Sequence, residues 1–271
     1  MTRIRRAMLA LMGASALLLG ACSSPSDAPS STPSNDSDTQ DSSEVSGTVT
    51  VFAAASLHKA FTDIAEELMS EYPDLEVTFS FEGSSTLVDQ MAEGAPADVF
   101  AAADEKNMNR ASEENLVGDA QEFATNVLTL ITPSGNPAGI TGLDDSLDGA
   151  RLVVCAPGVP CGNATAELTE KLGVTLTPVS EEQKVTDVRG KVEAGEADAG
   201  LVYTTDAKSA GDAVEIIEVP GADQVVNHYP IALTVRGADN PGAQAFIDAV
   251  LSASGQEILA GYGFGPGADA S

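Results

Sequence analysis

The apolar residues of this chain follow two alternating patterns over most of its length. The run from Thr48 to Ala55 is almost wholly apolar or β-branched, which is typical of a buried strand. From Leu57 to Leu68 the apolar positions instead recur every three or four residues. This spacing predicts a helix that Ser56 caps and that ends near Glu71.

The same alternation continues to the end of the chain. We expect further strands at 75–81, 98–103, 126–132, 150–156, 196–203 and 229–235. We expect further helices around 87–91, after Asp104, at 163–172, around 185–192, from Thr204 and at 243–259. Strands and helices in this order predict an α/β fold with a mostly parallel sheet flanked by helices.

The N-terminus has the layout of an export signal. Three arginines precede an apolar run from Ala7 to Gly20, which is shorter than the ~20 residues of a membrane-spanning helix. The segment Leu19-Gly-Ala-Cys22 resembles the lipobox of bacterial lipoproteins, which implies a signal peptide at 1–21 and a lipid on Cys22. The alternative is an ordinary secretory peptide that ends beside a cysteine. We expect no membrane-spanning segment after Cys22.

Residues 22–47 differ from the rest in composition. Apart from Val45 they hold no large apolar residue, so we expect a disordered Ser/Asp/Pro tether after the lipidated cysteine. The whole chain has a net charge of −28; without residues 1–21, 10 basic residues remain against 41 acidic ones. A field of this sign argues against binding to nucleic acid or to an anionic membrane face.

Two cysteines remain for the folded part, Cys155 and Cys161. An exported protein matures in an oxidising compartment, so a disulfide that closes this short loop is favoured over two free thiols. A metal site is not expected, because neither His58 nor His228 lies at a usual ligand spacing from the pair.

Motifs of known enzymes are absent from the sequence. It contains no phosphate-binding glycine loop, no nucleophile elbow and no zinc-protease motif. We therefore expect neither an enzyme nor a bound cofactor. A serine-dependent hydrolase that uses Ser56 or Ser84 stays open as an alternative.

Small and hydroxyl residues open several helices directly after strands. They are Ala54-Ala-Ser56, Gly83-Ser-Ser-Thr86 and Val159-Pro-Cys-Gly-Asn163. In an open parallel sheet, ligands bind beyond the carboxyl ends of the strands. Helix N-termini there present free N–H groups, which favour an anion.

An ordered set of segments resembles the periplasmic molybdate-binding proteins of ABC importers. The set is Val51-Phe-Ala-Ala-Ala-Ser-Leu57, Gly83-Ser-Ser-Thr-Leu87, Gly94-Ala-Pro-Ala-Asp-Val-Phe100, Asp187-Val-Arg-Gly190, Gly200-Leu-Val-Tyr203 and Tyr229-Pro. The resemblance implies the two-lobed periplasmic-binding-protein fold with the ligand in the cleft. One lobe would span 48–126 plus 229–271, and the other 127–228.

The family's ligand groups carry over to five positions. Side-chain hydroxyl and backbone N–H donors would come from Ser56 and Ser84, backbone N–H groups from Cys161 and Val188, and a phenol O–H from Tyr203. A slip of one residue from Ser84 to Ser85 stays open. The resemblance also implies an ABC permease as partner, a monomer, and a lipid-anchored position on the outer face of the cytoplasmic membrane.

The donor set bears on the choice of anion. None of the five residues is a carboxylate, and donors alone suit a fully deprotonated dianion rather than phosphate, which keeps a proton. This favours molybdate, tungstate or sulfate, unless Glu82 or Asp187 points into the site. A receptor for sulfate or another small oxyanion is therefore one alternative. A sensor or adhesion lipoprotein that binds no ion is another.

Overall fold

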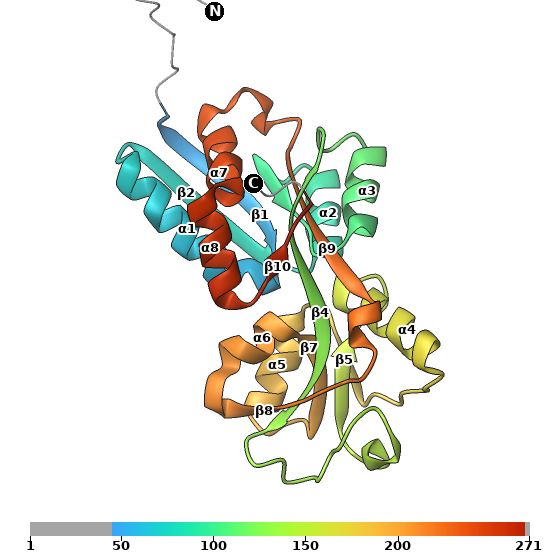
Figure 1. The fold of residues 1–271 in the computed structure, drawn as a ribbon. Helices are drawn as coiled ribbons and strands as arrows, with labels where there is room; N and C mark the ends of the chain where they lie inside the picture. The colour runs from blue at the N-terminus through green and yellow to red at the C-terminus, as the bar shows by residue number, and fades with distance from the viewer. Residues whose placement is uncertain (1–44, 269–271) are drawn as a thin grey trace, which may run out of the picture. The chain divides into compact units, whose positions relative to one another are not determined.

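The computed structural model describes residues 45–268, in which strands run through both halves of an α/β fold (Figure 1). The expected fold class is confirmed. The strands are β1 (Gly47–Ala54), β2 (Leu75–Glu82), β3 (Val99–Ala101), β4 (Gln121–Pro133), β5 (Leu152–Cys155), β6 (Ser180–Glu182), β7 (Ala199–Tyr203), β8 (Val214–Ile217), β9 (Val226–Leu233) and β10 (Gly265–Pro266).

Helices cover the strands of both halves. The α-helices are α1 (His58–Glu71), α2 (Ser84–Ala92), α3 (Glu105–Glu113), α4 (Pro160–Leu172), α5 (Val185–Glu193), α6 (Thr204–Ala210), α7 (Pro241–Leu251) and α8 (Ala253–Tyr262). The 3-10 turns are η1 (Ala55–Leu57), η2 (Asp145–Leu147), η3 (Gly211–Ala213), η4 (Ala222–Gln224) and η5 (Gly237–Asp239).

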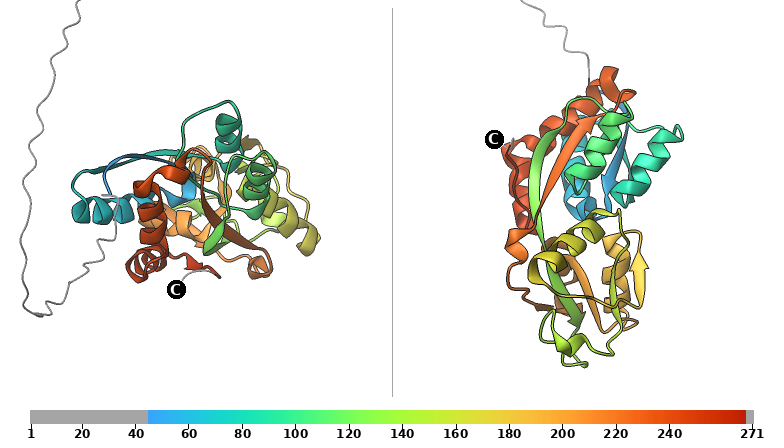
Figure 2. Two further views of the ribbon diagram at one scale, coloured as in Figure 1. Left: turned by 90° about the horizontal axis from the view of Figure 1, so that it is seen from above. Right: turned by 90° about the vertical axis from the view of Figure 1, so that its right-hand side faces the viewer.

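Two long strands connect the two halves. The strand order is β2-β1-β3-β9-β4-β7-β5-β6, and β8 and β10 also pair with β4. The pairs β1/β2, β1/β3, β5/β6 and β5/β7 are parallel, whereas β4 and β9 run antiparallel to each other and to their other partners. One lobe thus contains β1–β3, the other contains β5–β7, and β4 and β9 pass between them (Figure 2).

The first lobe buries both faces of its sheet. Strand β1 sends Val51 into the core that contains Phe61 of α1 and Phe246 of α7, and sends Phe52 into a second core with Leu87 of α2. This follows from the two-residue period of a strand. Because both faces are covered, β1 reads as the continuous apolar run seen in the sequence.

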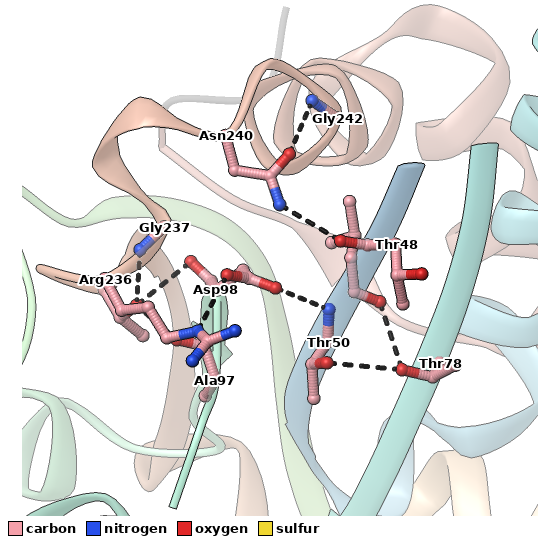
Figure 3. Close-up of polar contacts among 11 residues, drawn as sticks. Thr48, Thr50, Thr78, Ala97, Asp98, Arg236, Gly237, Asn240 and Gly242 are labelled. Carbon is pink, nitrogen blue, oxygen red and sulfur yellow. Dashed lines mark hydrogen bonds and ion pairs between the residues drawn. The ribbon is translucent and has the colours of Figure 1, made fainter. Parts of the chain in front are cut away.

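A polar cluster fastens the amino ends of β1 and β3 to the segment that follows β9 (Figure 3). The buried carboxylate of Asp98 accepts a hydrogen bond from the Thr50 N–H at 2.8 Å and lies 3.4 Å from Nε of Arg236. Asn240 donates to the Thr48 carbonyl at 3.2 Å and caps α7 through the Gly242 N–H. The opposite, carboxyl ends of the strands stay free of these ties and face the other lobe.

Two expectations about local structure are wrong. Ser56 does not cap a helix, because it lies inside the 3-10 turn η1 that precedes α1, and its hydroxyl bonds elsewhere. The helix expected at 243–259 is two helices. Ser252 ends α7 and caps α8 by accepting a hydrogen bond from the Gly255 N–H.

Within residues 45–268 no helix is both long and apolar enough to cross a membrane. The expected signal peptide, the lipid site Cys22 and nearly all of the tether lie outside the described residues.

Candidate functional site

A small cavity lies where the carboxyl ends of the strands of both lobes meet. Four of the five predicted ligand residues line it: Ser56 and Ser84 from the first lobe, and Cys161 and Tyr203 from the second. Its volume is about 10 Å³, close to the least that holds one water molecule, so it cannot hold a sugar or an amino acid. Ser85 does not line the cavity, so the structure favours Ser84 over its neighbour.

Helix N-termini surround this cavity. The helices α2, α4 and α5 and the turn η1 begin at its wall, and none of them has a side-chain cap. By contrast, Asp104, Asn240 and Ser252 cap α3, α7 and α8. The uncapped ends leave N–H groups without an intrahelical partner and add a partial positive charge. The cavity is therefore suited to an anion.

Close backbone approach brings the two lobes together here. A Cβ atom on Gly83, which precedes α2, would lie only 2.2 Å from the carbonyl oxygen of Gln183 in the other lobe. A Cβ on Gly162 in α4 would likewise meet the Ala156 carbonyl at 2.0 Å. Glycine at these two positions lets the turns around the cavity pack backbone against backbone.

A disulfide fixes the start of α4. Cys155 at the end of β5 and Cys161 in the first turn of α4 are bonded, with 5.6 Å between their Cα atoms. The cysteine that lines the cavity therefore offers no thiol.

Val188 lies away from the cavity. It is fully buried as the fourth residue of α5, where its side chain packs beside Gly200 of β7. The carbonyl of Lys184, which caps the helix, accepts a hydrogen bond from the Asp187 N–H at 3.1 Å. The ligand role predicted for the Val188 N–H stays a prediction. Val185, the first residue of α5, lines the cavity instead. Val185 and Val188 share one helix face, so periodicity alone did not separate them.

Carboxylates near the cavity are either paired or turned away. Glu82 lines the cavity, and its carboxylate lies 3.1 Å from Nζ of Lys184 in the other lobe. Asp187 is exposed and does not line the cavity. The negative charge of Glu82 is therefore balanced by an ammonium group that also lines the cavity.

The hydroxyl groups of the cavity all bond to protein. Ser84 Oγ accepts a hydrogen bond from the Ala103 N–H at 3.1 Å, and Tyr203 Oη accepts one from Nδ2 of Asn227 at 3.0 Å. Ser56 Oγ lies 3.1 Å from the Tyr229 hydroxyl. The recorded hydrogen-bond partners of these serines are the Tyr229 hydroxyl for Ser56 and the Ala103 N–H for Ser84.

Comparison with known proteins gives the family of this chain. A family model described as bacterial extracellular solute-binding protein matches residues 49–265. This chain belongs to that family. The molybdate-binding protein ModA of Mycobacterium tuberculosis is 44% identical over 218 residues, which is 80% of this chain and 84% of the relative. ModA of Escherichia coli is 35% identical over 230 residues, 80% of this chain and 89% of the relative.

Solved structures of other binding proteins share the fold. The periplasmic molybdate-binding protein of Azotobacter vinelandii superposes with a TM-score of 0.70 at 19% identity, over 80% of this chain and 98% of that one. The sulfate-binding protein SubI of Mycobacterium tuberculosis gives a TM-score of 0.66 at 21% identity, over 81% of this chain and 86% of that one.

This solute-binding protein has a second, larger cavity beside the first. It has a volume of about 310 Å³ and shares Ser56 and Lys184 with the small cavity. Its wall includes Asp206 of α6, which is 2% exposed and lies 3.8 Å from a guanidinium nitrogen of Arg189. Burial raises the pKa of Asp206 to about 7, although the charge of Arg189 opposes this shift.

Metal chelation has no support in the described part of the chain. No group of three or more His, Cys, Asp or Glu side chains there is arranged to hold a metal ion. The hydrogen-bond donors around the small cavity suit the oxygen atoms of an oxyanion, which accept hydrogen bonds.

Proposed function

We propose that this protein captures molybdate, and also tungstate, outside the cytoplasmic membrane and delivers it to an ABC permease. The observation that carries the proposal is the convergence of four uncapped helix starts and three hydroxyls on a cavity for one small ion. The identity of 44% to a molybdate-binding protein supports molybdate as the anion.

The proposed ligand set is Ser56, Ser84, Cys161, Val188 and Tyr203, and Val185 is a further candidate donor. Ser56, Ser84 and Tyr203 provide hydroxyl protons, and backbone N–H groups come from the helix and turn starts that include Cys161 and Val185. Val185 is added because it is the first residue of α5 and lies in the cavity wall.

The lobes close around the ion by bending within β4 and β9. The proposed boundaries at 126/127 and 228/229 fall inside these strands, where Asn126 pairs with Asn227. Hinge closure around a ligand is the usual motion of this architecture. Cys22 carries the lipid that keeps the monomeric receptor near its permease, and the segment after Cys22 gives it reach.

Calorimetric titration of residues 45–271 with molybdate, tungstate, sulfate and phosphate tests the proposal. We expect saturable binding of molybdate and tungstate with one ion per chain, and much weaker binding of phosphate. Preference for sulfate over molybdate would change the assignment to a sulfate receptor. Absence of heat with all four anions would refute the proposed function.

The residue-level test compares Ser84→Ala with Ser85→Ala, because only Ser84 lines the cavity. We expect only Ser84→Ala to lose affinity for molybdate.

A further inference from the structure

The oxygen atoms of the three cavity hydroxyls are already held by donors from the protein. A hydroxyl can donate one proton and accept at its lone pairs. One acceptor lone pair of Ser84 is occupied by the Ala103 N–H, and one of Tyr203 by Nδ2 of Asn227. Each of these two hydroxyls is thus left with its proton to offer to a ligand.

The orientation of the Asn227 amide is fixed by its second contact. Its Nδ2 also lies 2.9 Å from the carbonyl oxygen of Ala103, which can only accept a hydrogen bond. The group facing both Ala103 and Tyr203 is therefore the NH₂ group, and its contact with Tyr203 is a donation. Oδ1 of Asn227 is buried and has no hydrogen-bond partner among the described residues, so this side chain acts here only as a donor.

Asn126 fixes the third hydroxyl through Tyr229. Oδ1 of Asn126 accepts from the Val127 N–H at 3.0 Å, so its Nδ2 is the group that donates to the Tyr229 hydroxyl at 3.4 Å. The proton of Tyr229 is then free to be donated to Ser56 Oγ, which is 3.1 Å away. Either hydroxyl of this pair can be the donor, and donation by Tyr229 leaves the proton of Ser56 for the cavity.

Both tyrosines retain their protons. Burial is the main cause that raises the pKa of Tyr203 and of Tyr229 above the ordinary value, so both are neutral donors at any physiological pH. The hydroxyls of Tyr203 and Tyr229 also bond to each other, which gives the Tyr203 proton a partner when no ligand is bound.

We propose that Asn227, and Tyr229 together with Asn126, are positioning residues that direct the protons of Tyr203 and Ser56 toward the ligand. This inference rests on the proposed function and specifies its substrate class, a tetrahedral oxyanion without a proton. Hydrogen phosphate would bring a proton that meets the protons of these hydroxyls, and the carboxylate in the cavity wall, that of Glu82, is already paired with Lys184. The two asparagines are paired across β4 and β9, so the strands that join the lobes also carry the residues that orient the cavity hydroxyls.

The first test measures selectivity. Without the donor of Asn227, the Tyr203 hydroxyl can turn and accept the proton of hydrogen phosphate. We expect Asn227→Leu to weaken molybdate binding about tenfold and to weaken phosphate binding less, which narrows the ratio of the two affinities. Asn107→Leu is the matched control, because Asn107 is also a buried asparagine but bonds to Asp104 and Gly158 rather than to a cavity hydroxyl. An equal loss for both anions in Asn227→Leu would overturn the proposal.

A double-mutant cycle tests whether Asn227 acts through Tyr203. If it does, adding Asn227→Leu to Tyr203→Phe costs at most about threefold more affinity for molybdate than Tyr203→Phe alone. Losses that multiply would show that Asn227 acts by another route, and would overturn its role. Asn126→Leu with Tyr229→Phe provides the same cycle for the hydrogen bonds that lead from Asn126 through Tyr229 to Ser56.

A third measurement needs no ligand. The chain has four tyrosines, so a protein labelled with ¹³C at tyrosine Cζ gives four signals. We expect Asn227→Leu to shift the Tyr203 signal, and Asn126→Leu to shift the Tyr229 signal, in the free protein. Unchanged signals in folded variants would overturn the proposed positioning roles of Asn227 and Asn126. Absence of anion binding by the unmodified protein would instead refute the proposed function.

Discussion

The cavity wall contains an acidic side chain, which repels an anion, and a basic side chain, which attracts it. Glu82 is a carboxylate in the wall of the site, and alone it would repel a dianion. Its partner Lys184 is 3.1 Å away and comes from the other lobe. The pair is about one-third exposed, so its contribution to stability is small, and its main effect is to cancel charge at the site.

Asp206 makes stability depend on pH. Its pKa is about 7 in the folded protein and near 3.8 in an unfolded chain, so folding retains a proton between these values. Stability should therefore fall as the pH rises from about 4 to about 7. We expect Asp206→Asn to raise the free energy of unfolding by roughly 2–4 kcal/mol at pH 8 and to leave it nearly unchanged at pH 4, in urea titrations at both values. Equal gains at both pH values, or a similar gain in the exposed control Asp212→Asn, would contradict this account.

The role of a residue at the cavity could be predicted from the sequence where the chain pattern or the resemblance indicates it. It could not be predicted where contacts between distant residues decide it. Ser84 and Tyr203 could be placed beside strand ends from pattern and resemblance, and both line the cavity. Val188 has a predicted ligand role only through the resemblance, because it shares one face of α5 with Val185 and the apolar pattern does not distinguish their N–H groups. Asn126 and Asn227 gave no signal, since their partners Tyr229 and Tyr203 are distant in sequence.

Helix starts are the elements that give the cavity its electrostatic character. The apolar pattern predicted most helices, but it could not show which would lack a cap. Ser56 has a residue type that favours a cap, yet its hydroxyl contacts Tyr229 across the fold. The break at Ser252 was also hidden, because the apolar spacing continues across it from α7 into α8.

The start of α5 can be tested with proline. Proline at the first helical position removes one N–H but fits the helix, and Lys184 before it is already extended. We expect Val185→Pro to weaken molybdate binding about 10- to 100-fold, because one charge-assisted hydrogen bond is lost. Val185→Ala is the control, since it removes the same apolar contacts but keeps the N–H. Equal affinities for the proline and alanine variants in calorimetry would exclude Val185 as a donor.

The disulfide should stabilise the lobe of α4 more than it affects binding. It closes a loop with a sequence separation of 6, for which loop-closure entropy gives about 2 kcal/mol. We expect the double variant Cys155→Ser, Cys161→Ser to lose about this much free energy of unfolding in urea titrations. The backbone N–H of residue 161 remains, so affinity should fall less than about tenfold. A loss of binding without a loss of stability would show that the bridge acts mainly on the site.

At the scale of the whole molecule, the same two strands join the lobes and support the site. Strands β4 and β9 carry Asn126 and Asn227, and other polar contacts cross between the lobes around the cavities. Lys59 of α1 donates to the Ser209 carbonyl at 2.9 Å, and Asn163 of α4 donates to Asp104 at 2.9 Å. Bending of the strands on opening would therefore break these hydrogen bonds between the lobes. It would at the same time move the two asparagines that contact Tyr203 and Tyr229.

The overall charge of the chain gives a last prediction. The full sequence carries −28, yet the proposed ion is a dianion. At physiological salt, charges more than about 8 Å from the site are largely screened. The close donors are neutral dipoles, and Lys184, the nearby cation, is already paired with Glu82. We therefore expect the affinity for molybdate to change less than about threefold between 50 and 500 mM sodium chloride. Titrations at five salt concentrations would measure this slope. A steep loss of affinity with salt would show that an unpaired cationic group, rather than the helix starts and hydroxyls, holds the anion.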